Sequence, residues 1–318
     1  ALGKKGRLYL RFIIAAAFIA AAIYSYSAIA SVPSSTPAIV NTNGTTVNGV
    51  LIANASIARA SDQLFGYANF TNENASQEDI KRTYRKLARK YHLAVIEDAC
   101  HALGAKYRNK KIGSLSDMTV FSFHPVKSIT TGEGGAILTS DAGYYRKLLS
   151  LRSHGIHKDK DGKNVMTDLG YNYRITDLQT ALGSSQLPKL DRFIRSRRAV
   201  VSRYEKALKN LKGVILPNEL AGNYSAWHLF VIRTADFKMR DRLVNWLKSK
   251  GVGVNFHYPA VYAHPYWRKH GFAKLALLNE EIYQKSCLTL PCYPTLTASE
   301  INFVCQTIKN FFRAYSKK

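Results

Sequence analysis

Three short runs of β-forming residues constrain the fold of this chain more than any other feature. The runs cover residues 93–96, 118–123 and 136–139, and the connections between them are rich in glycine and polar residues. Apolar runs of this length between turn residues are typical of buried strands in α/β sheets. The 318 residues, 46% of them hydrophobic, are enough for one large or two modest globular domains. The pattern therefore predicts an α/β fold.

The composition excludes several classes of protein. The apolar content is too high for disorder of the whole chain. The cysteines are too few for a disulfide scaffold and form no zinc-binding pattern, so we interpret them as reduced thiols and expect no metal site; they are Cys100, Cys287, Cys292 and Cys305. The net charge of +25 is accompanied by no nucleic-acid-binding motif. We therefore expect a solvated basic surface that attracts anionic small molecules, and no nucleic-acid partner.

The first 32 residues have the composition of a signal peptide. Residues 4–11 are basic, residues 12–23 form an uninterrupted apolar run, and residues 28–30 have the small-x-small pattern of a signal-peptidase site. A membrane anchor is an alternative, because the apolar run extends to roughly twenty residues. A buried Ala-rich helix is a third interpretation. Residues 33–76, rich in Ser, Thr and Asn, resemble a linker.

A basic amphipathic helix is predicted over about residues 77–91. Ser76 and Asp79 resemble a capping pair, and apolar residues then recur at helical spacing. This stretch resembles the second helix of a J-domain, but that module needs His-Pro-Asp next, and His92-Leu93-Ala94 stands there instead. A generic helix leading into the first strand is favoured. A membrane-anchored co-chaperone-like protein remains one alternative function.

Charged side chains stand where the predicted strands end. Glu97 and Asp98 follow the first run, and His124 and Lys127 follow the second. Ligands of parallel α/β sheets bind at this edge. An aspartate and a lysine there are what a pyridoxal phosphate enzyme needs, because the carboxylate keeps the pyridine nitrogen protonated while the amine forms a Schiff base. Taken singly, each residue is weak evidence, because an aspartate that ends a strand is usually a turn residue and a lone lysine is usually solvated.

A series of motifs resembles the DegT-type family of pyridoxal-phosphate-dependent nucleotide-sugar aminotransferases. In order, they are EDACHALGAKY, IGSLSDMTVFSFHPVKSITTGEGGAILTSD, LRSHGI and LGYNYRITDLQTALGSSQL. The FSFHPVK…TTGEGG version resembles the branch that acts on UDP-linked 4-keto-6-deoxy amino sugars on the way to pseudaminic acid. The resemblance covers residues 93–318 and implies a type I, aspartate aminotransferase-like fold with a large α/β domain and a smaller α+β domain. It also implies amino transfer from an amino acid, glutamate being expected, to the 4-keto carbon of the sugar, in a cytoplasmic homodimer with shared sites.

The resemblance assigns roles to individual residues. Lys127 matches the lysine that binds the cofactor and shuttles the proton, and Asp98 matches the acid paired with the pyridine nitrogen. His101 matches a residue that touches the cofactor ring, and Ser122 a hydroxyl donor to the phosphate. Asn172 matches an asparagine that reaches the phosphate of the partner subunit; a turn residue capping the next helix is the alternative.

The C-terminal part is predicted to form the smaller α+β domain. His228 and His257 resemble positions on the substrate side of the family, with a core or interface histidine as the alternative. The predicted elements are a helical stretch over 175–211 broken at Pro188, strands over 227–232 and 251–259, and a helix over about 239–250.

Three features of the family are not recognisable before residue 93: its first strands, a Ser-Gly-Thr turn that holds the phosphate, and an aromatic ring stacked on the pyridine. We therefore expect a large domain truncated at its N-terminus. A non-catalytic family member that acts as a binding or interaction protein is the second alternative function. The expected segments are 1–32, 33–76, a partial large domain over 77–211 and a small domain over 212–318.

Overall fold

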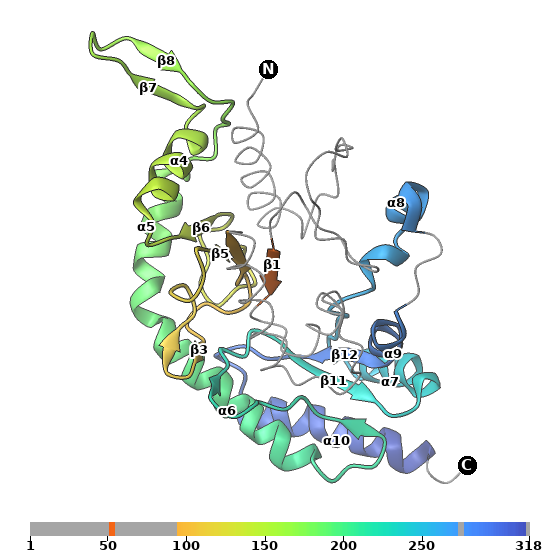
Figure 1. The fold of residues 1–318 in the computed structure, drawn as a ribbon. Helices are drawn as coiled ribbons and strands as arrows, with labels where there is room; N and C mark the ends of the chain where they lie inside the picture. Colours follow the sequence, from red (N-terminus) through yellow and green to blue (C-terminus); the bar gives the residue numbers. More distant parts are fainter. Residues whose placement is uncertain (1–50, 55–93, 273–276, 316–318) are drawn as a thin grey trace. The chain divides into compact units, whose positions relative to one another are not determined.

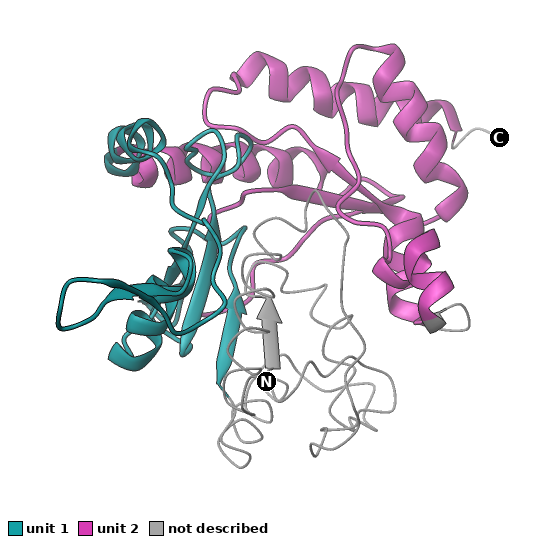
Figure 2. Cartoon of the chain, turned by 90° about the horizontal axis from the view of Figure 1, so that it is seen from above, with its two compact units in different colours: residues 1–188 teal, residues 189–318 magenta. Residues whose placement is uncertain are grey.

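A computed structural model describes residues 51–54, 94–272 and 277–315. They belong to two compact units that divide between Pro188 and Lys189 (Figure 2). The predictions for residues 1–32 and 77–91 lie outside the described residues, and the linker-like segment 33–76 is described only at Leu51–Asn54. Within the described ranges, no helix combines the length and the apolar character needed to cross a membrane.

The first unit contains a four-stranded sheet with the order β1-β2-β5-β6 (Figure 1). Strands β1 (Leu51–Asn54), β2 (Val95–Asp98) and β5 (Met118–Ser122) are parallel, and β6 (Gly135–Leu138) runs antiparallel to β5. The three strands predicted from the sequence are therefore confirmed, with ends shifted by a few residues. Because β2 and β5 are parallel neighbours, their carboxyl ends meet at one edge of the sheet.

A small apolar core lies on one face of this sheet. Ile96, Met118 and Val120 are buried there, and helix α4 (Ala142–Arg152) contributes Tyr144 and Leu148. The remaining elements of the unit are β3 (Lys106–Tyr107), β4 (Lys110–Lys111), β7 (Ile156–Lys158), β8 (Asn164–Met166) and α5 (Asp177–Gln186). The predicted break at Pro188 is confirmed, because the 3-10 turn η1 (Leu187–Lys189) separates α5 from the next helix.

The second unit packs helices on the three-stranded antiparallel sheet β12-β11-β9. Its core is almost wholly apolar, with Tyr204, Phe230, Leu247 and Phe311 at most 2% exposed. The elements are α6 (Leu190–Leu208), β9 (Val214–Ile215), β10 (Asn223–Tyr224), β11 (Phe230–Thr234), α7 (Phe237–Ser249), η2 (Val261–Ala263), α8 (Pro265–Trp267), η3 (Arg268–Phe272), α9 (Leu278–Ser286), β12 (Cys287–Leu290) and α10 (Ala298–Tyr315).

Helix α6 packs in the second unit although it precedes the domain boundary expected at residues 211 and 212. Its buried residues recur every three or four positions, from Ile194 to Leu208, as on one face of a helix. That face joins the core of the second unit. The domain bounds expected from the sequence stay a prediction.

One predicted strand is wrong. No strand forms over residues 251–259, where the backbone makes only an isolated bridge between Asn255 and Thr289. Two nearby backbone N–H groups donate to side chains instead, Phe256 N to the Asn255 side chain and Ala260 N to Gln284 Oε1. These hydrogen bonds to side chains take the place of the backbone ladder that a strand would need. The predicted helix over 239–250 and the strand over 227–232 are confirmed as α7 and β11.

Candidate active site

Asp98 ends strand β2 at the carboxyl edge of the sheet. The next residue, Ala99, donates its N–H to the carbonyl of Val120 on β5 at 2.9 Å, which fixes the strand end. The carboxylate of Asp98 accepts a hydrogen bond from Cys100 N at 3.0 Å. Burial raises the pKa of Asp98, whereas the hydrogen bond from Cys100 and the positive charge of Lys127 act in the opposite direction.

Lys127 lies in the loop between β5 and β6 and is only 7% exposed. The backbone N–H of Lys127 donates a hydrogen bond to the carbonyl of His124 at 3.0 Å. Burial lowers the pKa of its amine, and the neighbouring Cys100 and Asp98 act in the opposite direction. The structure thus brings the ionisable groups of Asp98, Cys100 and Lys127 close enough to influence one another's pKa.

Ser122 and His101 lie at or just after the same two strand ends. Ser122, the last residue of β5, is 3% exposed, and its hydroxyl accepts a hydrogen bond from His124 N at 3.4 Å. His101 lies three residues after the end of β2 and is half-buried. Both residues belong to the first unit and lie close in the chain to Asp98 or Lys127.

Glu97 is excluded from this group, although it directly precedes Asp98. Successive side chains of a strand point to opposite faces. The carboxylate of Glu97 accepts hydrogen bonds from Ser116 Oγ and Thr119 Oγ1, both at 3.3 Å. Of the two acids at the strand end, only Asp98 interacts with Lys127.

Asn172 lies on the surface of the first unit. It forms an isolated antiparallel bridge with Ser153, and its neighbours Tyr171 and Tyr173 stack with ring centroids 5.2 Å apart. Both tyrosine N–H groups donate to carbonyls at the end of α4. The segment is therefore held by its backbone while the side chain of Asn172 stays exposed.

His228 and His257 belong to the second unit. His228 is 7% exposed, and its carbonyl accepts a hydrogen bond from Arg197 Nη1 at 3.2 Å. His257 Nδ1 lies 2.7 Å from Thr289 Oγ1, and the carbonyl of His257 accepts from Tyr283 at 2.8 Å. These contacts serve packing within the unit, and a substrate-side role for either histidine stays a prediction.

Comparison with known proteins identifies the family. The model of the DegT/DnrJ/EryC1/StrS aminotransferase family matches residues 78–309. The chain belongs to this family. Aminotransferases of the family depend on pyridoxal phosphate, and their type I fold contains the parallel strands that end in Asp98 and precede Lys127 in this chain.

Relatives with known names support the same assignment. A UDP-4-amino-4,6-dideoxy-N-acetyl-beta-L-altrosamine transaminase from Campylobacter jejuni is 36% identical over 235 residues, which are 73% of this chain and 62% of the relative. The aminotransferase DesV from S. venezuelae is 28% identical, with a TM-score of 0.69 over 82% of this chain and 64% of DesV. The chain spans 61 to 65% of the length of the curated relatives it matches.

A further solved structure shows the fold alone. PseC from Helicobacter pylori, an aminotransferase involved in the biosynthesis of pseudoaminic acid, has a TM-score of 0.73 at 23% identity, covering 98% of this chain and 92% of PseC. The predicted fold class, a type I pyridoxal-phosphate-dependent transferase, is confirmed.

Some residues at the site of this family member were not singled out from the sequence. Cys100 is buried against Asp98, and burial followed by the Asp98 charge raises the pKa of its thiol. Ser128 and Thr131, in the same loop as Lys127, are 7% and 4% exposed. Their proximity to Lys127 in the sequence was the available signal. Hydroxyl side chains are common in loops, so that signal alone is weak.

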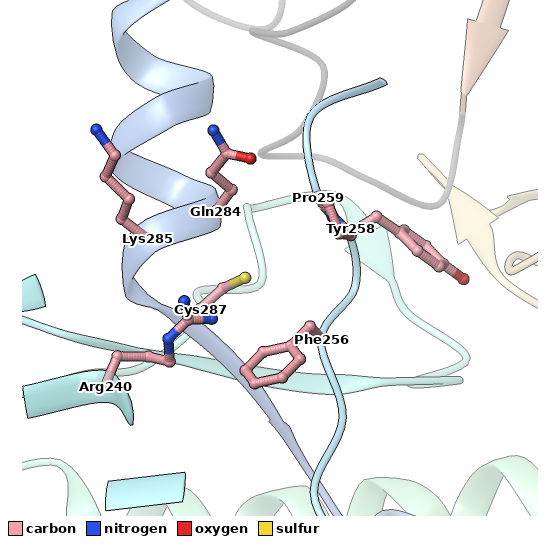
Figure 3. A pocket seen from close by; sticks show the side chains of 7 residues that line it. All are labelled: Arg240, Phe256, Tyr258, Pro259, Gln284, Lys285 and Cys287. Carbon is pink, nitrogen blue, oxygen red and sulfur yellow. The ribbon is translucent and has the colours of Figure 1, made fainter. Parts of the chain in front are cut away.

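The second unit contains a separate hollow of about 280 Å³ (Figure 3). Two cations line it, Arg240 from α7 and Lys285 from α9. Each has a carboxylate neighbour, Asp241 at 2.7 Å from Arg240 and Glu281 at 3.0 Å from Lys285. Because these charges are already paired, the candidate active site is the group around Asp98 and Lys127.

Proposed function

We propose that this chain is an aminotransferase that moves an amino group from an amino acid, glutamate in the proposed reaction, to the 4-keto carbon of a nucleotide-linked deoxy sugar. One observation carries the proposal: a buried lysine, Lys127, interacts with a half-buried aspartate, Asp98, at the carboxyl ends of adjacent parallel strands. Family membership and the name of the Campylobacter relative support this class of substrate.

The donor set at these strand ends fits pyridoxal phosphate. Asp98 is a carboxylate able to accept a hydrogen bond from a protonated pyridine nitrogen, and that positive ring would oppose the rise in its pKa caused by burial. Ser122 would donate its buried hydroxyl to the phosphate, and His101 would contact the ring. When bound, pyridoxal phosphate supplies an electron sink that weakens the bond between the α carbon and hydrogen of the amino donor.

Lys127 would carry the proton. Burial lowers the pKa of its amine, which increases the neutral fraction at a given pH. A neutral amine can accept the α proton of the donor at Nζ and return it to another carbon, as a general base and then a general acid. Cys100 and the carboxylate of Asp98 oppose this fall in the pKa of Lys127, so the protonated amine can still serve as the acid that returns the proton.

We propose in addition a homodimer that covers an apolar surface of the first unit. Helix α5 has no buried residue, and its Leu178 and Leu182 are 86% and 40% exposed. Tyr171 and Tyr173, on either side of Asn172, are 39% and 42% exposed. Exposed apolar side chains that gather on a globular protein favour a protein partner. In this dimer Asn172 would reach the phosphate held by the partner subunit.

The dimer is tested by the molar mass in solution. Leu178→Glu places a charge on the proposed interface, and we expect it to convert the dimer into a monomer in light scattering after size exclusion. Leu278→Glu, at a residue 75% exposed on the second unit, is the matched control and should leave the mass unchanged. A monomeric wild-type chain would remove this part of the proposal.

A cytoplasmic location is also proposed, because it suits the free thiols of Cys100, Cys287, Cys292 and Cys305. An association with the membrane through residues 12–32 stays a prediction of the sequence. Fractionation of cells that express the chain separates the two locations.

Amino transfer is tested directly with the purified chain, pyridoxal phosphate, glutamate and a UDP-linked 4-keto-6-deoxy amino sugar. We expect a product carrying the amino group of ¹⁵N-glutamate, detected by mass spectrometry. Absence of a product, together with absence of a reducible cofactor adduct at Lys127, would favour the alternative of a non-catalytic family member.

A further inference from the structure

Helix α5 turns a polar face toward the loop that carries Lys127. Gln179, Gly183 and Gln186 are spaced by four and three residues, so they share one face of the helix. None of the ten residues of α5 is buried, and apolar packing therefore contributes little to its position. The contacts of this polar face show what the helix does.

The two glutamines bind the backbone of the loop at two points. Gln186 Oε1 accepts a hydrogen bond from Thr130 N at 3.1 Å. Gln179 Nε2 donates a hydrogen bond to the carbonyl of Glu133 at 2.9 Å. Both partners are main-chain groups, so the contacts fix the path of the loop rather than the side chains on it.

Gly183 lets the helix approach between these two points. A Cβ atom at this position would lie 2.8 Å from Cγ2 of Thr131, closer than carbon atoms pack. Thr131 is itself only 4% exposed. The helix therefore contacts the loop at residues 130, 131 and 133.

The segment held by α5 is hydrogen-bonded to the residue that begins the lysine loop. Thr131 N and Thr130 Oγ1 both donate to the carbonyl of Phe123, at 3.0 and 2.9 Å, and Phe123 N donates to the carbonyl of Gly134 at 2.8 Å. Lys127 lies between the two joined ends. A shift of residues 130–134 would therefore move both ends of the loop that presents Lys127.

We propose that Gln179 and Gln186 are positioning residues, which hold the lysine loop so that Nζ of Lys127 stays at its place beside Asp98. The inference deepens the proposed function and rests on it for the reaction that Lys127 performs. It does not depend on that function for the geometry of the loop, which the five hydrogen bonds to main-chain groups described above define.

The two glutamines use different ends of their amides, which makes the proposal testable by one substitution made twice. Gln186 serves as an acceptor. Gln179 serves as a donor to the loop, while its Oε1 accepts from Thr176 N at 3.0 Å in the capping box of α5. A glutamate at 186 keeps the acceptor. A glutamate at 179 keeps the capping box but replaces the donor by an oxygen that faces the carbonyl of Glu133.

The experiment compares Gln179→Glu, Gln186→Glu and Gln186→Ala with the full-length wild-type chain. Gln306→Glu, at an exposed glutamine of α10, is the matched control. The first measurement is the dissociation constant of pyridoxal phosphate and the pH dependence of its absorbance when bound. Losing one hydrogen bond predicts roughly threefold to tenfold weaker binding, with a shifted absorbance titration, for Gln179→Glu and Gln186→Ala. Gln186→Glu should stay within about twofold of the wild type, as a conservative rescue.

A second measurement separates failure of this inference from failure of the proposed function. The chain without cofactor is labelled at lysines with acetic anhydride over a range of pH, and labelling of Lys127 is followed by mass spectrometry. Release of the loop exposes the amine, so Gln179→Glu and Gln186→Ala should move the labelling midpoint toward that of an ordinary lysine. If the wild-type chain binds no pyridoxal phosphate, the proposed function is refuted, but the labelling of Lys127 can still be compared between the variants and the wild type.

Two results would overturn the inference. If the labelling midpoint of Lys127 is the same in Gln179→Glu and Gln186→Glu, or if all variants match the wild type, the glutamines do not position the loop. If unfolding temperatures of the variants fall together with the changes at Lys127, and Gln186→Glu gives no rescue, the two residues have only a structural role.

Discussion

The loop around Lys127 and the core of the second unit are stabilised by different forces. Residues 123–134 are joined by hydrogen bonds among main-chain groups, hydroxyls and glutamine amides. The core of the second unit is an apolar cluster in which Phe230, Leu247 and Phe311 are fully buried. Hydrogen bonds are directional and place atoms accurately, whereas apolar burial contributes most of the folding free energy. Substitutions in the two regions should therefore affect different measurements.

The strongest test of this difference is Lys127→Ala. The change removes the amine that interacts with Asp98, so the covalent adduct formed by borohydride reduction with pyridoxal phosphate should be lost at this position. The free energy of unfolding should stay the same or rise slightly, because a desolvated amine is removed. Peptide mapping and urea unfolding measure the two effects. Label recovered at Lys106 or Lys110 in the wild type would contradict the assignment.

The opposite result is expected from Phe311→Ala. This ring is fully buried and packs against Trp246, Phe312 and Tyr315. Its truncation should lower the free energy of unfolding by about 3–5 kcal/mol. Phe303→Ala, on the same helix α10 but 53% exposed, is the control and should cost less than about 1 kcal/mol. Similar losses for the two variants would show that burial of Phe311 contributes less than the structure indicates.

These contrasts show which features were predictable from the sequence. Short apolar β-forming runs, and the charged residues after them, predicted that Asp98 and Lys127 converge at one edge of the sheet, because neighbouring parallel strands share an edge. The contacts of Gln179 and Gln186 were not predictable. Helical spacing shows that they share a face, but not which loop that face meets, since their partners lie 56 and 46 residues away in the chain.

The predicted strand over 251–259 failed for a related reason. Alternation of residue types describes the side chains, but a strand also needs backbone partners. In this segment and directly after it, the N–H groups of Phe256 and Ala260 bind side-chain oxygens of Asn255 and Gln284. Those partners depend on local geometry and on helix α9, neither of which the alternation contains.

We expect Glu280, a buried carboxyl group in the second unit, to make the stability of the chain depend on pH. Burial raises its pKa from 4.5 to about 7, while a hydrogen bond from the backbone of Val261 acts in the opposite direction. The folded state therefore binds a proton more tightly than the unfolded state. The contribution of Glu280 to the free energy of unfolding is fully present below about pH 4.5 and is lost as the pH rises through about 7. The shift corresponds to about 3 kcal/mol at most.

Glu280→Gln should remove this pH dependence. The amide cannot ionise but keeps an oxygen that accepts from Val261. We expect the difference in unfolding free energy between this variant and the wild type to grow in favour of the variant from pH 5 to pH 8. Urea unfolding at several pH values measures the difference. A constant difference over this range would show that Glu280 ionises at its ordinary pKa in the folded chain.

The smallest expected effect concerns a polar contact at the edge of the apolar core. Arg198 donates from Nη1 and Nη2 to the two carboxylate oxygens of Glu219 at 2.8 and 2.9 Å, and its guanidinium lies 4.2 Å from the ring centre of Tyr224. Burial alone would raise the pKa of Glu219, but the hydrogen bonds from Arg198 and Ser225 lower it. The pair is therefore a real charge interaction, although both side chains are partly exposed.

Arg198→Lys keeps the positive charge but loses the bidentate hydrogen bonds to Glu219 and the planar contact with Tyr224. We expect a loss of about 1 kcal/mol in urea unfolding, well below the loss in Phe311→Ala. Lys285→Gln, which breaks the exposed pair with Glu281, is the control and should cost no more than about 0.5 kcal/mol. If Arg198→Lys lowers stability as much as Phe311→Ala, directional polar contacts stabilise the second unit as strongly as its core does. The division between a hydrogen-bonded site and an apolar scaffold would then not hold.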